Sequence, residues 1–147
     1  MSDIRFAKVS YANDNVKLPT RSDPASAGYD FYLPRGIILN SGQADLVFTD
    51  IKAYMPSDTV LLITIRSSLA KKGLILLNAP GVVDASYVDN PNNEGNIGLL
   101  LYNLSKDPIE LKAGDRVAQG IFFKYFCVSG DHQGLFIRNG GFGSTGR

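Results

Sequence analysis

Two segments of the chain contain residue types that could do chemistry, and the first is centred on Asp84. The dipeptide Pro80-Gly81 predicts a turn, and the two valines that follow predict a short strand that presents Asp84 and then Tyr87. A carboxylate at the end of a strand can act as a general base, but acids also end strands for purely structural reasons. The residues alone leave both interpretations open.

The second segment is the stretch 138–147, which holds four glycines, two hydroxyl side chains and two arginines but no acid. Glycines let backbone N–H groups approach an anion closely, and Ser144 and Thr145 add further donors. The lone Phe142 suits a lid that stacks on a planar base. A frayed terminus is the alternative, and both interpretations hold if the tail orders over a ligand. The composition therefore indicates phosphate or nucleotide binding.

Other chemistries are excluded by what the chain lacks. A single cysteine, Cys127, and a single histidine, His132, cannot form an internal disulfide or a zinc site. Cys127 lies in an apolar run and is expected to be a buried, inert thiol, whereas His132 is expected in a surface loop. Fifteen basic and fourteen acidic residues give a net charge of +1. We therefore expect no nucleic acid or anionic membrane as partner, and any bound anion must be held by local geometry.

Length and composition predict one folded domain in the cytoplasm. The 147 residues are 44% hydrophobic and 20% charged, which excludes a disordered chain. Apolar runs such as 60–63 are too short to cross a membrane. The N-terminus lacks the apolar region of a signal peptide and is too short for a transit sequence.

The elements that must position the reactive residues are short strands. The segments rich in β-formers are 46–55, 60–65, 98–102, 109–111 and 117–128, and turn sequences at 56–58, 106–108 and 113–115 divide them. The nearly continuous apolar run 60–65 predicts a strand buried on both faces. A helix is expected only around 67–72, with Gly73 as its C-cap. The pattern predicts an all-β sandwich or barrel with at most one short helix.

Five segments in order resemble the motifs of the trimeric deoxyuridine triphosphatases (dUTPases), and the resemblance spans residues 19–147. They are AGYDF (27–31), RSSLA (66–70), GVVDASY (81–87), GDRVAQ (114–119) and GGFGSTG (140–146). The resemblance implies a distorted jelly-roll-like β domain at 1–137 and a flexible C-terminal lid at 138–147. It also implies a homotrimer whose active sites are shared between subunits.

The resemblance further implies hydrolysis of dUTP to dUMP and pyrophosphate, which keeps uracil out of DNA and supplies dUMP for thymidylate synthesis. Asp84 would hold the water that attacks the α-phosphorus, and Mg²⁺ would be held mainly by the substrate phosphates and water, with no direct protein ligand assigned. Asn78, Tyr87 and Phe142 would bind the uracil and the sugar. Asp30 would be structural or would reach the metal through water. The phosphate chain would contact Arg66, Ser67, Ser68, Gln119, Arg138, Gly141, Gly143, Ser144 and Thr145.

Three departures from the family pattern stand out. Ser86 replaces the second aspartate of the third motif, and the polar insertion 89–94 follows it. This insertion is expected to extend a surface hairpin, or alternatively to crowd the pocket or serve a partner. Ser68 stands where glycine is commoner. Only three residues separate Arg138 from Phe142, where the family has four, so the reach of Arg138 to the γ-phosphate is open.

Two other functions are alternatives to dUTP hydrolysis. A deoxycytidine triphosphate deaminase shares the fold but needs a glutamate that acts on a water at C4. The two glutamates of the chain, Glu94 and Glu110, lie outside the core of the third motif. A catalytically weak, nucleotide-binding or regulatory trimer is the other alternative, and the retention of Asp84, Gln119 and the glycine tail argues against it.

Overall fold

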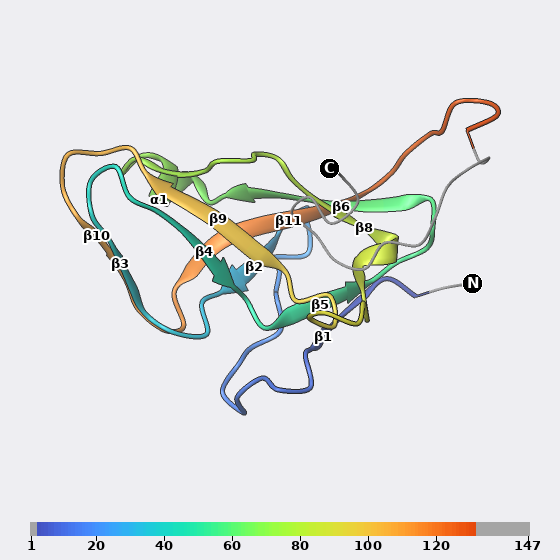
Figure 1. Cartoon of the computed structure of the whole chain (residues 1–147), viewed down its shortest axis with the longest axis horizontal. Coiled ribbons are helices and arrows are strands. Elements are labelled where there is room, and N and C mark those ends of the chain that lie inside the picture. The colour runs from blue at the N-terminus through green and yellow to red at the C-terminus, as the bar shows by residue number, and fades with distance from the viewer. Residues whose placement is uncertain (1–2, 132–147) are drawn as a thin grey trace.

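A computed structural model of the chain describes residues 3–131, which are almost entirely β (Figure 1). The strands are β1 (Arg5–Lys8), β2 (Tyr29–Tyr32), β3 (Ile37–Leu39), β4 (Ala44–Phe48), β5 (Ile51–Tyr54), β6 (Thr59–Ile65), β7 (Leu74–Leu76), β8 (Gly81–Asp84), β9 (Gly98–Asn103), β10 (Ile109–Leu111) and β11 (Arg116–Lys124). One short helix, α1 (Ser67–Ala70), and one 3-10 turn, η1 (Ala85–Tyr87), interrupt them. Neither of these helical segments is long and apolar enough to cross a membrane.

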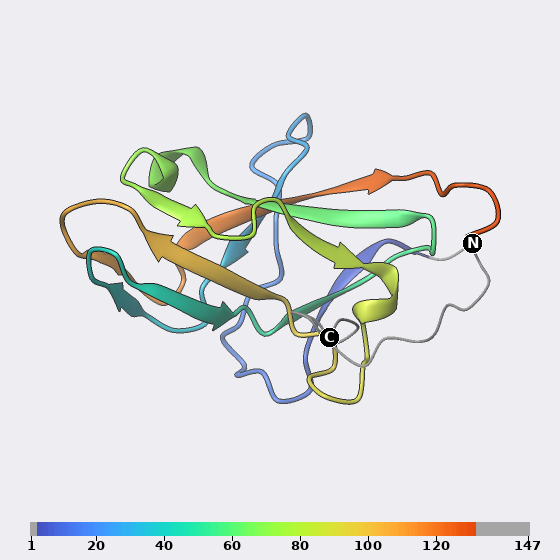
Figure 2. The same cartoon turned by 45° about the horizontal axis from the view of Figure 1, so that its top comes forward.

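The strands form two facing layers in which every pair is antiparallel. A four-stranded sheet has the order β2-β11-β6-β8, and a three-stranded sheet has the order β4-β9-β7. The pairs β1-β5 and β3-β10 extend this arrangement at its two ends (Figures 1 and 2). The expected all-β sandwich with one short helix is confirmed.

The core lies between the two sheets and is built from side chains that alternate along their strands. Leu61 and Ile63 of β6 are buried, as are Leu99 and Leu101 of β9. Burial of such aliphatic side chains is the main stabilising term of a sandwich. The expectation that 60–65 is buried on both faces is wrong, because Thr64 is exposed and its neighbours on that face are only partly covered.

The last strand ends earlier than the apolar run predicts. Lys124 pairs with Thr59, the first residue of β6, so the chain beyond it has no strand to continue the ladder. Phe126 is 99% exposed and Cys127 is exposed as well. The expectation of a buried thiol at Cys127 is therefore wrong, and His132 lies outside the described residues.

The segment 46–55 is two strands rather than one. Asp50 adopts a left-handed φ of 62° between β4 and β5, where the chain leaves the β9 ladder and joins β1. Its buried carboxylate accepts hydrogen bonds from Arg35 at 3.1 Å and from Asn96 at 3.0 Å, which hold the corner. The helix falls where the sequence predicts it, and Gly73, with a φ of 95°, closes the turn that follows.

A matched pair of leucine substitutions tests this account of the core. We expect Leu61→Ala to lower the free energy of unfolding by about 2–5 kcal/mol, because the fully buried side chain leaves a cavity between the sheets. Leu18→Ala, at an exposed leucine, should cost less than about 1 kcal/mol. Denaturant unfolding at one protein concentration measures both, and equal losses would contradict the assignment of the core.

Candidate active site

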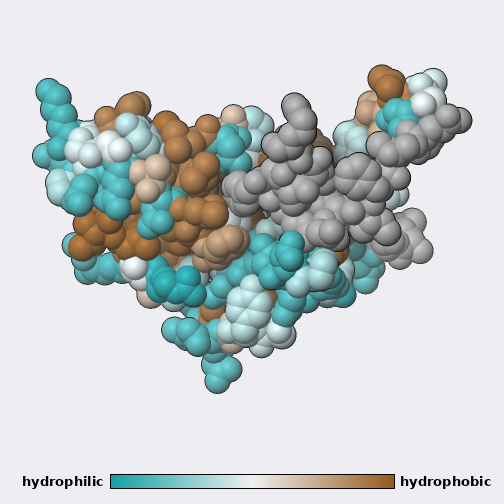
Figure 3. All heavy atoms as spheres, in the orientation of Figure 1, coloured by the Kyte–Doolittle hydropathy of each residue, from teal (hydrophilic) through white to brown (hydrophobic). Residues whose placement is uncertain are grey.

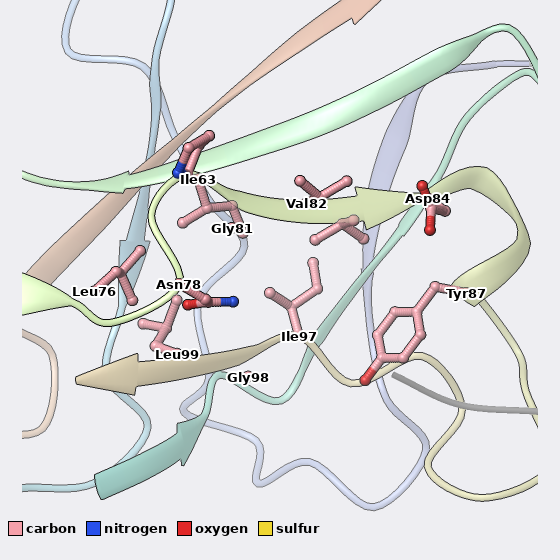
Figure 4. A pocket seen from close by; sticks show the side chains of 12 residues that line it. Ile63, Leu76, Asn78, Gly81, Val82, Asp84, Tyr87, Ile97, Gly98 and Leu99 are labelled. Carbon is pink, nitrogen blue, oxygen red and sulfur yellow. The ribbon is translucent and has the colours of Figure 1, made fainter. Parts of the chain in front are cut away.

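A cavity of about 380 Å³ opens between β8 and the start of β9. Figure 4 shows Asn78, Asp84 and Tyr87 around it, brought from the turn before β8, the end of β8 and the turn after it. The remaining wall is largely apolar and comes from β6, β7, β8 and β9 and from the residues directly before β8 and β9. It consists of Ile63, Leu76, Pro80, Gly81, Val82, Val83, Ile97, Gly98 and Leu99. Three residues singled out from the sequence thus meet in one place.

Local pairing explains why these side chains converge. Within the described part of the chain, β8 pairs only with β6, in a register that sets Asp84 opposite Val60 at the end of the ladder. On the other side of the cavity, the Leu77 N–H donates to the Leu100 carbonyl at 2.9 Å and fixes the position of Asn78. An apolar cavity with a few convergent polar groups is the usual form of a small-molecule site.

The Tyr87 ring is buried in the cavity wall and its hydroxyl is anchored. The hydroxyl donates to the Asn96 carbonyl at 2.6 Å and accepts from the Asn93 side-chain amide at 2.8 Å. Sequence reasoning missed both asparagines, and the run of polar residues directly after the third motif was the signal that could have indicated them.

The polar loop 89–94 is not the expected extension of a hairpin, because β8 and β9 do not pair with each other. The loop closes on itself instead: the Asp89 N–H donates to the Glu94 carbonyl at 2.8 Å. Both residues have a left-handed φ, at 57° and 61°. The loop folds back toward β5 because its carboxylates find cationic and hydroxyl partners there.

An ion-pair network fastens this loop to β5 and to the N-terminal segment. Lys52 contacts Asp89 at 2.6 Å and Glu94 at 3.3 Å, and the Tyr54 hydroxyl donates to Asp89 at 2.7 Å. The Ser10 hydroxyl and N–H donate to Glu94. The hydrogen bond from Lys52 lowers the pKa of Asp89, and those from Ser10 lower the pKa of Glu94. In return, Asp89 raises the pKa of Lys52.

A second hollow, of about 530 Å³, is lined by the predicted site residues Asp30, Arg66, Ser67, Ser68 and Gln119. Its floor includes Gln119 and Ile121, which lie opposite Thr64 and Leu62 in the β6–β11 ladder. They therefore occupy the face of the sheet away from the buried Leu61 and Ile63. The other lining residues come from the segment before β2, from β2 itself and from the N-terminal end of α1, and they are Ser22, Ser26, Ala27, Gly28, Asp30, Arg66, Ser67 and Ser68.

Asp30 organises this outer hollow. Its buried carboxylate lies 3.3 Å from the Arg66 Nε and 3.5 Å from the Arg116 Nη1. A carboxylate shared by two guanidinium groups holds both in fixed positions. Gly28 gives Gln119 its room, since a Cβ there would lie 2.4 Å from the Gln119 Oε1. Arg116 lies within the fourth motif, and its contact with Asp30 follows from a strand pairing that the sequence does not reveal.

The two hollows are separate within one chain and have no lining residue in common. Asp84 pairs with Val60 at one end of β6, whereas Arg66 directly follows Ile65 at the other end. Six residues of extended strand span about 20 Å. The predicted site residues therefore fall into two groups at opposite ends of one strand. Arg138, Gly141, Phe142, Gly143, Ser144 and Thr145 lie outside the described residues.

Neither hollow contains a ready metal-binding cluster. Over residues 3–131, the structure places no three His, Cys, Asp or Glu side chains where they could hold an ion together. The side chains that line the outer hollow offer oxygen atoms from Asp30, from Gln119 and from the four serines Ser22, Ser26, Ser67 and Ser68. Oxygen is the ligand type that Mg²⁺ prefers.

Comparison with known proteins identifies the family. A family model described as dUTPase matches residues 14–146. The deoxyuridine 5'-triphosphate nucleotidohydrolase of Lactococcus lactis subsp. lactis is 40% identical over 138 residues, which cover 92% of each chain. The crystal structure of dUTPase from Streptococcus mutans has a TM-score of 0.80 at 39% identity, and the match covers 85% of this chain and 98% of that one. This chain belongs to the dUTPase family, and the jelly-roll-like fold implied by its motifs is confirmed.

A more distant structure shares the fold alone. It is a mutant dUTPase from phage phi11 of S. aureus, with a TM-score of 0.73 at 19% identity, covering 91% of this chain and 98% of that one. In that protein the coordination of a structural Mg(II) ion was described.

The network around Lys52 generates a pH-dependent prediction. Lys52→Met keeps the aliphatic stem but removes the cation, so we expect a lower melting temperature at neutral pH. Asp89 has a folded pKa below its ordinary value of 3.8, so its stabilisation is present above that value and disappears as the pH falls through the folded pKa. The difference in melting temperature between the two proteins should therefore shrink on acidification.

The control is Lys106→Met, at an exposed lysine in the turn after β9. It should leave the melting temperature nearly unchanged across the same pH range. A Lys52→Met difference that stays constant down to the acid limit of folding would contradict the role of the ion pair.

Proposed function

We propose that this protein is a dUTP diphosphatase that hydrolyses dUTP to dUMP and pyrophosphate in the cytoplasm. The observation that carries the proposal is the meeting of Asn78, Asp84 and Tyr87 in one largely apolar cavity. Membership of the dUTPase family and the 40% identity to a nucleotidohydrolase named for this substrate support it.

The cavity supplies the groups for recognition and for attack. The amide of Asn78 can accept from the N3–H of uracil and donate to its O4, and cytosine reverses both polarities, so the wrong base leaves buried groups unpaired. The Tyr87 ring packs under the sugar, where a ribose 2′-hydroxyl has no room. Asp84, the last residue of β8, accepts a proton from the water that attacks the α-phosphorus.

The outer hollow supplies the binding of the phosphate chain. Arg66 is held by Asp30 through its Nε, which leaves its two terminal nitrogens to donate to phosphate oxygens. Ser67, Ser68 and Gln119 line the same hollow and add neutral donors.

Mg²⁺ is part of the proposal as an ion held mainly by the triphosphate and water. The oxygen donors of the outer hollow suit it, but the Asp30 carboxylate is already engaged with two arginines. Asp30 would therefore act on a bound ion through water, or serve only to hold the two arginines. When bound, the ion neutralises charge on the triphosphate.

The separation of the two hollows supports a homotrimer with shared active sites. Because about 20 Å of strand separates Asp84 from Arg66, one triphosphate cannot contact both on the same subunit, and the outer hollow of a neighbour must supply the phosphate contacts. Figure 3 shows apolar side chains gathered over β4, β9 and the β3–β10 pair. Three large hydrophobic residues on or next to these strands are exposed, namely Ile38, Leu46 and Leu104. Such a patch suits a subunit interface. As the resemblance of its motif implies, we assign to the tail 138–147, which lies outside the described residues, the role of closing the shared site with Phe142 over the base.

The deaminase alternative finds no support in the described part of the chain. Glu94 is engaged by Ser10 and Lys52, and Glu110 lies exposed on β10. Neither glutamate lines either of the two hollows.

The first test is the release of pyrophosphate from dUTP, dCTP, dTTP and UTP in the presence of Mg²⁺. We expect release from dUTP alone, and Asp84→Asn should lower kcat by about 10²–10⁴-fold because the amide cannot take the proton. Binding of a non-hydrolysable dUTP analogue provides the control and should be retained by the variant. The absence of turnover with all four nucleotides would favour the regulatory alternative.

Sharing of sites between subunits is tested by complementation. Asp84→Asn and Gln119→Ala are each expected to be nearly inactive alone. When they are co-expressed equally in one trimer, roughly one site in four combines an intact Asp84 with a neighbour's intact Gln119, so about a quarter of the activity should return. Co-expression of Asp84→Asn with the double variant should restore nothing. A failure of the first pair to recover activity would show that each subunit carries a whole site.

A further inference from the structure

The inserted loop 89–94 lies directly against the residue that faces the sugar in the proposed function. It contacts Tyr87 twice: the Asn90 side-chain amide donates to the Tyr87 carbonyl at 2.8 Å, and the Asn93 amide donates to its hydroxyl at 2.8 Å. The loop therefore fixes both the backbone and the ring tip of a cavity residue.

The orientation of the Asn93 amide is set by the loop itself. Its Oδ1 accepts from the Gly95 N–H at 3.0 Å and from the Asn90 Nδ2 at 2.7 Å. A backbone N–H can only donate, so the oxygen must face Gly95 and the NH₂ group must face Tyr87. The amide cannot flip without losing both of these hydrogen bonds.

This orientation determines which hydrogen bond the Tyr87 hydroxyl accepts and which one it donates. Because Asn93 can only donate through its Nδ2, the Tyr87 oxygen accepts there and sends its own proton to the Asn96 carbonyl, at 2.6 Å. Asn96 directly precedes Ile97, another residue of the cavity wall. One chain of hydrogen bonds thus joins the loop, the tyrosine and the opposite wall.

The loop is rigid enough to act as an anchor. Asp89 is fastened to Lys52 and Tyr54, and Glu94 to Lys52 and Ser10. Gly95 admits no side chain, since a Cβ there would lie 2.6 Å from the Val88 Cα. The buried Asn90 caps the turn by accepting from the N–H groups of Asn92 and Asn93.

We propose that Asn93 is a positioning residue that acts through the Tyr87 hydroxyl to set the discrimination between deoxyribose and ribose. The proposal rests on the proposed role of Tyr87 under the sugar. With the donor removed, the ring is no longer held at one depth in the cavity, which weakens dUTP binding and makes room for a 2′-hydroxyl. The chemical step at Asp84 is not touched.

The test is a double-mutant cycle read out as the ratio of kcat/KM for dUTP to that for UTP. Asn93→Asp is nearly isosteric and keeps the acceptor that supports the loop, but it replaces the donor to Tyr87 by an acceptor. The single proton of the Tyr87 hydroxyl can then serve residue 93 or the Asn96 carbonyl but not both, so the ring is no longer held from both sides. We expect this substitution to lower the ratio about tenfold, the usual value of one hydrogen bond, mainly through a higher KM for dUTP with kcat little changed. Tyr87→Phe should lower the ratio similarly, and Asn93→Asp should then add nothing in the Tyr87→Phe background.

The control is Asn92→Asp, which introduces the same charge on the neighbouring exposed residue of the loop and should leave the ratio unchanged. An unaltered ratio in Asn93→Asp, or an undiminished effect of Asn93→Asp in the Tyr87→Phe background, would overturn the proposal. If thermal melting shows that Asn93→Asp does not fold, Asn93→Ser takes its place in the cycle, and unchanged selectivity in Tyr87→Phe would by itself overturn the proposal. If the wild-type protein does not hydrolyse dUTP, that result would instead contradict the proposed function itself.

Discussion

The antiparallel register of β6 is the constraint on which the rest of the structure depends. Its buried side chains form the floor of the core, and its two flanking strands carry the residues of the two hollows. Pairing with β8 brings Asp84 to the start of β6, and pairing with β11 brings Gln119 beside its end. A shift of β6 by one residue would turn Leu61 and Ile63 away from the core and would break its present pairing with the strands that carry Asp84 and Gln119. The same apolar burial that stabilises the sandwich therefore also places the chemistry.

The sequence predicted the elements better than their boundaries. The strand and turn around Asp84 were indicated by Pro80-Gly81 and two valines, because turn chemistry and β-branched residues act locally. The end of β11 could not be read from the apolar run 117–128, since it is set by where β6 begins. Cys127 was misassigned for this reason: apolar neighbours indicate burial only where another strand covers them.

In the candidate site too, the residues within one motif could be predicted from the sequence, whereas the contacts between distant segments could not. The resemblance to the family's third motif was sufficient to select Asn78, Asp84 and Tyr87, and all three line one cavity. The contacts that hold these residues were not predictable, because they join distant segments: Lys52 with Asp89, and Asp30 with Arg116. Charge pairs of this kind depend on the register of strands, and a single sequence does not state the register.

The closure of the loop between Asp89 and Glu94 also bears on how such a protein can change over generations. Because the two ends of the loop are joined by a hydrogen bond of 2.8 Å, the chain leaves and re-enters the body of the fold at nearly the same point. A gene segment that encodes these residues can be gained or lost as a unit without changing the positions of β8 and β9. A lineage that lacks it keeps the fold but must secure the neighbouring tyrosine by other means.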